Sequence, residues 1–223
     1  MTGEPSTADA GPAHVTGELA VAWFATFDAM VAAQAAWLTD LDAAIGDADH
    51  GTIMRHGAAA IARDVHRSDE DGLGPLLTTA GTAFGAAAGG AGGILFATFF
   101  QGLAAAVAGR DAVSLGSLAD AVAAGVACVQ VRGTAELGDK TMVDALVPAV
   151  VALRKAATAH VPLIEAVARG STSAASGRDA TFPLIARRGR ASYLGDRSRE
   201  HLDPGAATAS ILLESLATAA RTT

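Results

Sequence analysis

Residues 38–54 read LTDLDAAIGDADHGTIM, and this stretch sets the interpretation of the rest of the chain. Three carboxylates, Asp42, Asp47 and Asp49, fall within eight residues, with Gly46 between the first two. Positions 42 and 47 do not share a face of a regular helix, whereas a glycine-kinked loop can fold Asp47 and Asp49 back towards Asp42. The stretch therefore predicts a helix that ends at Gly46, a tight loop, and a second helix that begins near Thr52.

The three carboxylates predict a metal site. Carboxylates brought so close together repel one another unless a cation neutralises them, and Mg²⁺ prefers such oxygen ligands. A calcium loop of the EF-hand type is excluded because the spacings differ and no glutamate follows. The amides at the start of the second helix, residues 50–53, are placed to bind a phosphate. The simpler alternative is that these aspartates are turn formers and helix caps.

Composition favours an all-α fold. Hydrophobic residues make up 51% of the 223 residues and aromatic residues only 4%, so the core consists mainly of small side chains. Such a core suits closely packed helices and is poor for strands, and no convincing alternating pattern is found. We expect about eight helices in one domain over residues 14–223, preceded by a disordered tail over residues 1–13.

Charge and cysteine content exclude several classes of function. A net charge of −7 argues against a general nucleic-acid binder. The single cysteine, Cys128, excludes an internal disulfide, and its apolar surroundings predict a buried thiol. Residues 1–12 lack the features of a signal peptide, and the longest apolar stretch, residues 94–107, is too short to span a bilayer. These features predict a cytoplasmic protein that does not enter membranes.

Local signals place the individual helices. Thr16 and Asp203 are predicted N-caps, the latter followed by Pro204 at the first helical position. Ser117 and Asp120 form a plausible capping box. A proline at position 148 predicts a kink or a break. After the first helix, the expected helices cover residues 52–66, 74–88, a segment entered from the glycine cluster at 89–93, 117–131, 141–159, 162–180 and 204–220.

Three further segments carry candidate chemistry. The glycine cluster at 89–93 can expose backbone amides to a phosphate, or it can act as a hinge. Residues 132–142 nearly spell a phosphate-binding Walker A loop, but Asp139 precedes Lys140 and the preceding segment is helical rather than a strand, so we reject that interpretation. Five arginines lie within residues 187–199, either as a solvated charge run or as partners for phosphate oxygens.

The pattern Asp42-x4-Asp47-x-Asp49-His50-Gly51 resembles the signature of the L subunit of dihydroxyacetone kinase, the nucleotide-binding subunit. Further matches are Gly-Asp-Lys-Thr-Met at 138–142, Arg-Ala-Ser-Tyr-Leu-Gly at 190–195 and Asp-Pro-Gly at 203–205, so that the resemblance runs from about residue 38 to residue 205. Gly92 departs from the family pattern, which has a serine there. A hydroxyl is lost while the amides remain, so nucleotide affinity or exchange is expected to differ.

The resemblance implies antiparallel helices closed into a barrel, with the nucleotide at one end where the loops gather. The sequence alone supports a helical bundle. By match to the family, Met142 packs on the adenine, Gly133 lies beside the nucleotide and Arg190 neutralises the phosphates. The expected metal ligands are Asp42, Asp47 and Asp49, and the expected nucleotide-binding residues are His50, Gly51, Thr52, Ile53, Ala91, Gly92, Gly133, Met142, Arg190, Asp203, Pro204 and Gly205.

The implied function is phosphoryl transfer. In that family the L subunit uses ADP or ATP with one or two Mg²⁺ ions to phosphorylate dihydroxyacetone, which a separate K subunit binds. This sequence contains no counterpart of the K subunit, so we expect ADP to be recharged in place by a phosphohistidine M subunit of the phosphotransferase system. A homodimer is left open. Two alternatives remain, namely a kinase subunit for another ketose or polyol, and a nucleotide-binding regulatory module.

Overall fold

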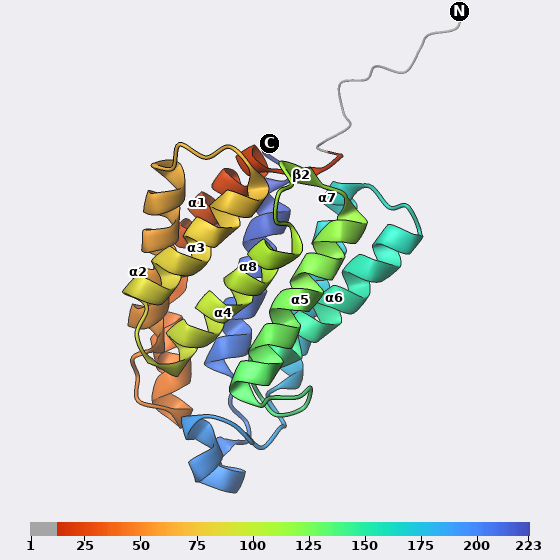
Figure 1. Cartoon of the computed structure of the whole chain (residues 1–223). Helices are drawn as coiled ribbons and strands as arrows, with labels where there is room; N and C mark the ends of the chain where they lie inside the picture. Colours follow the sequence, from red (N-terminus) through yellow and green to blue (C-terminus); the bar gives the residue numbers. More distant parts are fainter. Residues whose placement is uncertain (1–12) are drawn as a thin grey trace, which may run out of the picture.

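The computed structural model describes residues 13–223, so the predicted tail lies almost entirely outside the described residues. Within them the chain forms eight α-helices, one 3-10 helix and two two-residue strands (Figure 1). In chain order the elements are β1 (Val15–Thr16), α1 (Gly17–Ile45), α2 (His50–His66), α3 (Leu73–Ala87), α4 (Gly90–Ala106), β2 (Ala112–Val113), α5 (Leu115–Gly133), α6 (Met142–Thr158), α7 (Leu163–Ala180), the 3-10 helix η2 (Arg190–Ser198) and α8 (Pro204–Ala219). The predicted all-α class is confirmed.

The helices pack as a bundle in which each helix contacts the next one along the chain. The last helix, α8, packs on α1, α6 and α7, and it is buried on nearly all of its faces. A closed barrel is not formed, so this part of the expectation is corrected. A helix that is apolar almost all round is buried on all sides. Helix α8 is of this kind, so it packs among three neighbouring helices and is not one member of a ring of equivalent helices.

Helix ends follow their capping residues. Thr16 caps α1 by accepting a hydrogen bond from the amide of Leu19, as predicted. The predicted capping box at Ser117 is wrong, because Ser114 caps α5 by accepting from the amide of Ser117. The β1–β2 pair, in which Val15 lies opposite Val113, includes Thr16 and ends directly before Ser114, so it joins the starts of α1 and α5. These strands were not predicted, because a strand of two residues is too short to show an alternating pattern of apolar and polar residues.

Helix α6 passes through Pro148 without a break. A proline has no amide, so the carbonyl of Asp144, one turn earlier, receives no helical hydrogen bond at this point. Gly177 of α7 packs against that carbonyl, and a Cβ atom at Gly177 would lie 2.1 Å from the Asp144 oxygen. The close contact between the two helices covers the oxygen that the proline leaves free.

Two further observations bear on the sequence analysis. Cys128 is exposed on α5, so the prediction of a buried thiol is wrong. The inward face of that helix is formed by Val122, Val126 and Val129, and Cys128 lies off this face.

Helices α1 and α5 are long and apolar enough by composition to cross a membrane, a test that core helices of soluble proteins also pass.

Candidate functional site

One end of the bundle holds a cavity of about 430 Å³, a size that suits a small-molecule ligand. Four helices begin at its wall: α2 at His50, α4 at Gly90, α6 at Met142 and α8 at Pro204. A helix N-terminus presents unpaired amides and the positive end of the helix dipole. The convergence of four such ends makes this end of the bundle favourable for an anion.

Two of the four helix ends are capped and two are not. The side chains of Thr141 and Asp144 cap α6, and Asp203 caps α8 by accepting from the amide of Ala206 at 2.6 Å. Neither α2 nor α4 has a side-chain cap. The first amides of α4 are therefore available to phosphate oxygens, as expected of the glycine cluster, whereas at the start of α2 the amide of His50 is bonded to Asp42 and that of Ile53 to the carbonyl of Asp49.

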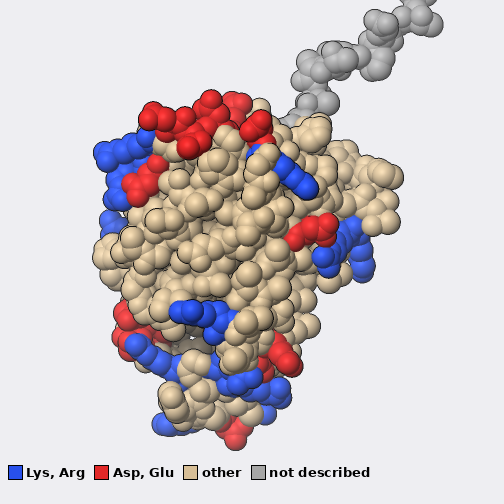
Figure 2. Space-filling model, in the orientation of Figure 1, with Lys and Arg blue, Asp and Glu red and all other residues tan. Residues whose placement is uncertain are grey.

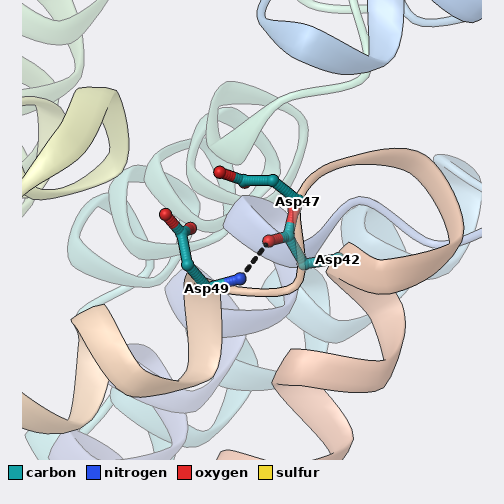
Figure 3. Close-up of side chains that lie close together, drawn as sticks. All are labelled: Asp42, Asp47 and Asp49. Atoms are coloured by element: carbon teal, nitrogen blue, oxygen red, sulfur yellow. Dashed lines mark hydrogen bonds between the residues drawn. The ribbon is translucent and has the colours of Figure 1, made fainter.

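The three aspartates lie together at the mouth of this cavity. One carboxylate oxygen from each of Asp42, Asp47 and Asp49 lies within 4.8 Å of the other two. Asp42 is buried, while the side chains of Asp47 and Asp49 are 42% and 48% exposed. Figure 3 shows the Asp47 and Asp49 carboxylates pointing to the same side of the loop. Three convergent carboxylate oxygens with an open side are a donor set that suits Mg²⁺, which also keeps water or phosphate ligands.

The loop is held in this shape by Asp42. Its Oδ2 atom accepts hydrogen bonds from the amides of Asp49, at 3.0 Å, and His50, at 3.1 Å (Figure 3 draws the first). Ala48, which lies between Asp47 and Asp49, adopts a φ of +63°, a left-handed conformation that is unfavourable for alanine. The strained turn at Ala48 reverses the chain, and this reversal returns Asp49 to Asp42.

His50 links the loop that carries Asp47 and Asp49 to α8. Its Nε2 atom lies 2.9 Å from the hydroxyl of Thr208 on α8. Burial lowers the pKa of the His50 imidazole to about 4, partly opposed by the charge of Asp42, so the ring is neutral at neutral pH. A neutral ring beside the cavity fixes the start of α2 without adding charge.

Arginines supply the positive side of the cavity. Arg190, at the start of η2, pairs with Asp47, and one of its guanidinium nitrogens lies 3.9 Å from Asp49. Arg132 and Arg188 also line the cavity, and the sequence analysis did not single out either of them as a contact. Figure 2 shows basic side chains around a hollow at the lower end of the molecule, where η2 lies in Figure 1.

The cavity lining also contains a set of apolar residues. Met142, the residue expected beside a base, is one of them, and Gly133 lines the cavity as well. The sequence analysis missed the other apolar residues of this set, because in sequence they look like ordinary core positions of α4 and α5. They are Ile94, Leu95, Phe96 and Val129. An apolar wall beside a charged one suits a ligand with a flat base and phosphates.

The structure brings nearly all the expected site residues to this cavity. The exceptions are Gly51 and Thr52, which do not line it. Gly51 has a packing role, because a Cβ atom there would lie 2.1 Å from the carbonyl oxygen of Ala35 and 2.3 Å from the Thr39 hydroxyl. Gly92 differs, since a Cβ atom there would make only ordinary contacts with Met54 and His50.

Comparison with known proteins adds the following. The sequence profile of the DAK2 domain matches residues 44–218. The chain is 37% identical over 201 residues to the PEP-dependent dihydroxyacetone kinase, ADP-binding subunit DhaL, of Escherichia coli (strain K12), covering 90% of this chain and 96% of that protein. It is also 38% identical over 200 residues to the L-erythrulose 1-kinase of Mycolicibacterium smegmatis, covering 88% of this chain and 34% of that protein.

Among solved structures, the fold is similar to that of the dihydroxyacetone kinase from C. freundii in complex with AMP-PNP and Mg²⁺. The TM-score is 0.69 at 25% identity, and the match covers 98% of this chain and 37% of that chain. The chain thus spans about a third of the length of these two larger kinases and nearly the full length of the Escherichia coli subunit.

Proposed function

The chain belongs to the DAK2 domain family, and on that basis we propose that residues 14–223 form the ADP-binding, phosphoryl-transferring L subunit of a dihydroxyacetone kinase. The observation that carries the proposal is the cavity in which three convergent carboxylates face two uncapped helix N-termini. Phosphoryl transfer needs mainly positioning and neutralisation of charge, and this cavity offers groups for both.

In this proposal Asp42, Asp47 and Asp49 hold one or two Mg²⁺ ions, which neutralise the phosphate oxygens. The free amides at the start of α4, including those of Ala91 and Gly92, bind the phosphates, and residues 50–53 at the start of α2 lie beside them. Arg190 exchanges its carboxylate partners for the phosphate that is transferred and stabilises the charge on it. The adenine lies on the apolar wall beside Met142, with Gly133 next to it, and residues 203–205 lie against the nucleotide.

We further propose that the phosphoryl group passes to dihydroxyacetone on a separate K subunit. The E. coli relative, which is similar to this chain over almost its whole length, is named as a PEP-dependent kinase subunit. This name supports recharging of the bound ADP by a phosphohistidine M subunit, with all three subunits in the cytoplasm. The isolated chain is then inactive on ATP and dihydroxyacetone, and robust turnover by the purified chain alone would contradict this.

The first experiment is calorimetric titration of ADP into nucleotide-stripped protein with and without Mg²⁺. Wild type is compared with Asp47→Asn and with the control Asp40→Asn, which changes an exposed aspartate of the same region outside the cavity. We expect binding that requires Mg²⁺, is at least tenfold weaker in Asp47→Asn and is unchanged in Asp40→Asn. Binding that is indifferent to Mg²⁺ and to Asp47 would overturn the metal assignment and favour the regulatory module.

A second candidate acceptor is a four-carbon ketose, which the similarity to L-erythrulose 1-kinase supports. The acceptor site lies on the K-type partner in either case, so this chain does not distinguish the two. Assays with the K-type subunit from the same genome, offered dihydroxyacetone and L-erythrulose in parallel, decide between them. The ketose that gains labelled phosphate is the substrate.

A further inference from the structure

Lys140, the lysine of the rejected Walker-like motif, is buried within the protein and is one of only two lysines in the sequence. It is 1% exposed, and its ammonium group donates hydrogen bonds to three backbone carbonyls. The acceptors are the oxygens of Thr181 at 2.9 Å, Leu184 at 3.2 Å and His201 at 2.5 Å. An ammonium group has three donors, so none is left for a phosphate.

The three carbonyls belong to the two ends of one connection. Thr181 follows directly on α7, Leu184 comes three residues later, and His201 lies just before α8. The chain between them carries η2 with Arg190. At the same point the Thr181 hydroxyl accepts a hydrogen bond from the amide of Asp203 at 3.0 Å. The Lys140 ammonium therefore joins the beginning and the end of the segment that brings Arg190 to the cavity.

The neighbouring Asp139 holds the same segment from its other side. Its carboxylate, only 7% exposed, lies 3.1 Å from Arg188 and 3.7 Å from Arg187, and its backbone oxygen accepts from the amide of Arg187. Beyond these contacts the segment is largely exposed, and it contains two glycines with positive φ, Gly189 and Gly195. Such a segment has little packing of its own, so the contacts at its base determine where it lies.

We propose that Asp139 and Lys140 are positioning residues that hold residues 181–203 so that Arg190 and the start of α8 reach the nucleotide. This rests on the proposed function of the cavity. A buried ammonium group without partners is costly, whereas one with three carbonyls is stable and binds them firmly. Burial lowers the pKa of Lys140, and the charges of Asp203 and Asp144 oppose that shift.

The test compares Lys140→Met with the matched control Lys155→Met, which changes the exposed lysine on α6. Methionine keeps most of the apolar stem and removes the ammonium. We expect Mg·ADP to bind about 10- to 100-fold more weakly to Lys140→Met and normally to Lys155→Met. We also expect trypsin to cleave faster within residues 187–199 of the nucleotide-free Lys140→Met protein, at unchanged helical content by circular dichroism.

A chemical rescue distinguishes positioning from a general loss of stability. Lys140→Ala removes three carbons and the nitrogen, which n-propylammonium restores. This ion is expected to strengthen Mg·ADP binding in Lys140→Ala and to slow the cleavage by trypsin. Tetramethylammonium at equal ionic strength has no N–H donor and is expected to do neither. Failure of n-propylammonium to restore either property in the folded variant would overturn the positioning role.

The outcomes separate this inference from the proposed function. If wild type does not bind Mg·ADP, the proposed function fails, while the trypsin comparison still tests whether Lys140 holds the segment. If wild type binds and Lys140→Met binds equally well with an equally protected segment, the inference is wrong. Should both Lys140 variants fail to fold, Asp139→Asn provides the same comparison, with weaker binding and faster cleavage expected and wild-type behaviour contradicting the inference.

Discussion

The imidazole of His50 and the hydroxyl of Thr208 lie 2.9 Å apart, although 158 residues separate them in the chain. This contact joins the start of α2, which follows the loop with Asp47 and Asp49, to the first turns of α8. It sets the distance between two of the helix ends that surround the cavity. The two residues therefore provide a direct test of how the phosphate end of the site is held.

Thr208→Val keeps the shape of the buried side chain and removes its hydroxyl. We expect the free energy of unfolding to fall by about 1 kcal/mol, since His50 loses its hydrogen-bond partner. We also expect weaker Mg·ADP binding, because the start of α2 is no longer fixed. Urea unfolding and calorimetry measure the two effects, and Thr218→Val, on an outer turn of α8, is the control.

Two glycines of the site are expected to respond oppositely to a side chain. Gly51→Ala forces a methyl group onto the carbonyl of Ala35 and is expected to destabilise the protein by about 2 to 3 kcal/mol. Gly92→Ser places its Cβ in ordinary van der Waals contact with Met54 and His50 and is expected to leave the midpoint of thermal unfolding unchanged. The new hydroxyl lies near the phosphate site, so slower release of ADP is expected in stopped-flow experiments. Equal loss of stability in both variants would contradict this assignment.

Arg190 pairs with Asp47 and lies 3.9 Å from Asp49, so in the proposed site it would compete with a metal ion for these carboxylates when no nucleotide is bound. Arg190→Gln removes the competing charge, so Mn²⁺ alone is expected to bind about three- to tenfold more tightly, as measured by electron paramagnetic resonance. Mg·ADP is expected to bind more weakly in the same variant, because the phosphates lose a cationic partner. Arg199→Gln, which changes an exposed arginine paired with Asp196, is the control. Parallel changes in both affinities would exclude the competition.

The carboxyl group of Asp203 gives a pH dependence whose sign is defined. Burial raises its pKa to about 7 from 3.8, opposed by its bond to the Ala206 amide; Asp144 and Asp42 add to the rise, and Lys140 opposes it. The folded protein thus holds a proton that the unfolded chain releases between these pH values. This contribution to stability is full below pH 3.8 and is lost as the pH rises through 7.

Asp203→Asn removes that titration and keeps a capping side chain. The difference in unfolding free energy between wild type and Asp203→Asn is expected to shift against wild type by roughly 1 to 3 kcal/mol between pH 4 and pH 8. Urea unfolding of both proteins in the presence of EDTA, from pH 4 to pH 8, measures this difference in free energy. A difference that does not change with pH would show that Asp203 is ionised throughout.

Lys140 is expected to resist amine-reactive reagents. With only two lysines in the chain, acetylation by acetic anhydride followed by mass spectrometry reads each of them separately. Lys155 is expected to react at the rate of a free lysine and Lys140 at least about 100-fold more slowly, because it is buried and all three of its donors are engaged. Equal rates in the folded protein would mean that the ammonium is not held by the three carbonyls.

Local sequence signals predicted the helices because capping residues and glycines act over a few residues. Thr16 and Asp203 lie where their capping preference indicates, and the carboxylate loop was recognised because its glycine interrupts a helical pattern. The sequence offers two serines, Ser114 and Ser117, that could cap this helix, and the wrong one was chosen. Both serines fit a helix start, and only the β1–β2 pairing fixes where α5 begins.

Long-range contacts were not predictable in the same way. The partners of Lys140 lie 41 to 61 residues away and are backbone carbonyls, which leave no mark in the side-chain sequence. The exposure of Cys128 depends on which face of α5 turns inward, and an apolar helix gives little indication of this. The arrangement of α8 among three other helices, in place of a closed barrel, likewise depends on packing between distant parts of the chain.

The contact between the two ends of the chain also has a consequence for synthesis. The carboxylate loop is complete once α2 has been made, whereas residues 203–208 are made only after α7 and η2. The hydrogen bond from the Trp23 indole to the carbonyl of Leu212, at 2.9 Å, likewise forms only after α8 has been made. A chain that stops before α8 therefore has the carboxylate loop but lacks Pro204 and Gly205 of the cavity lining. If Mg·ADP binds as proposed, it stabilises molecules that contain α8 over molecules that lack it.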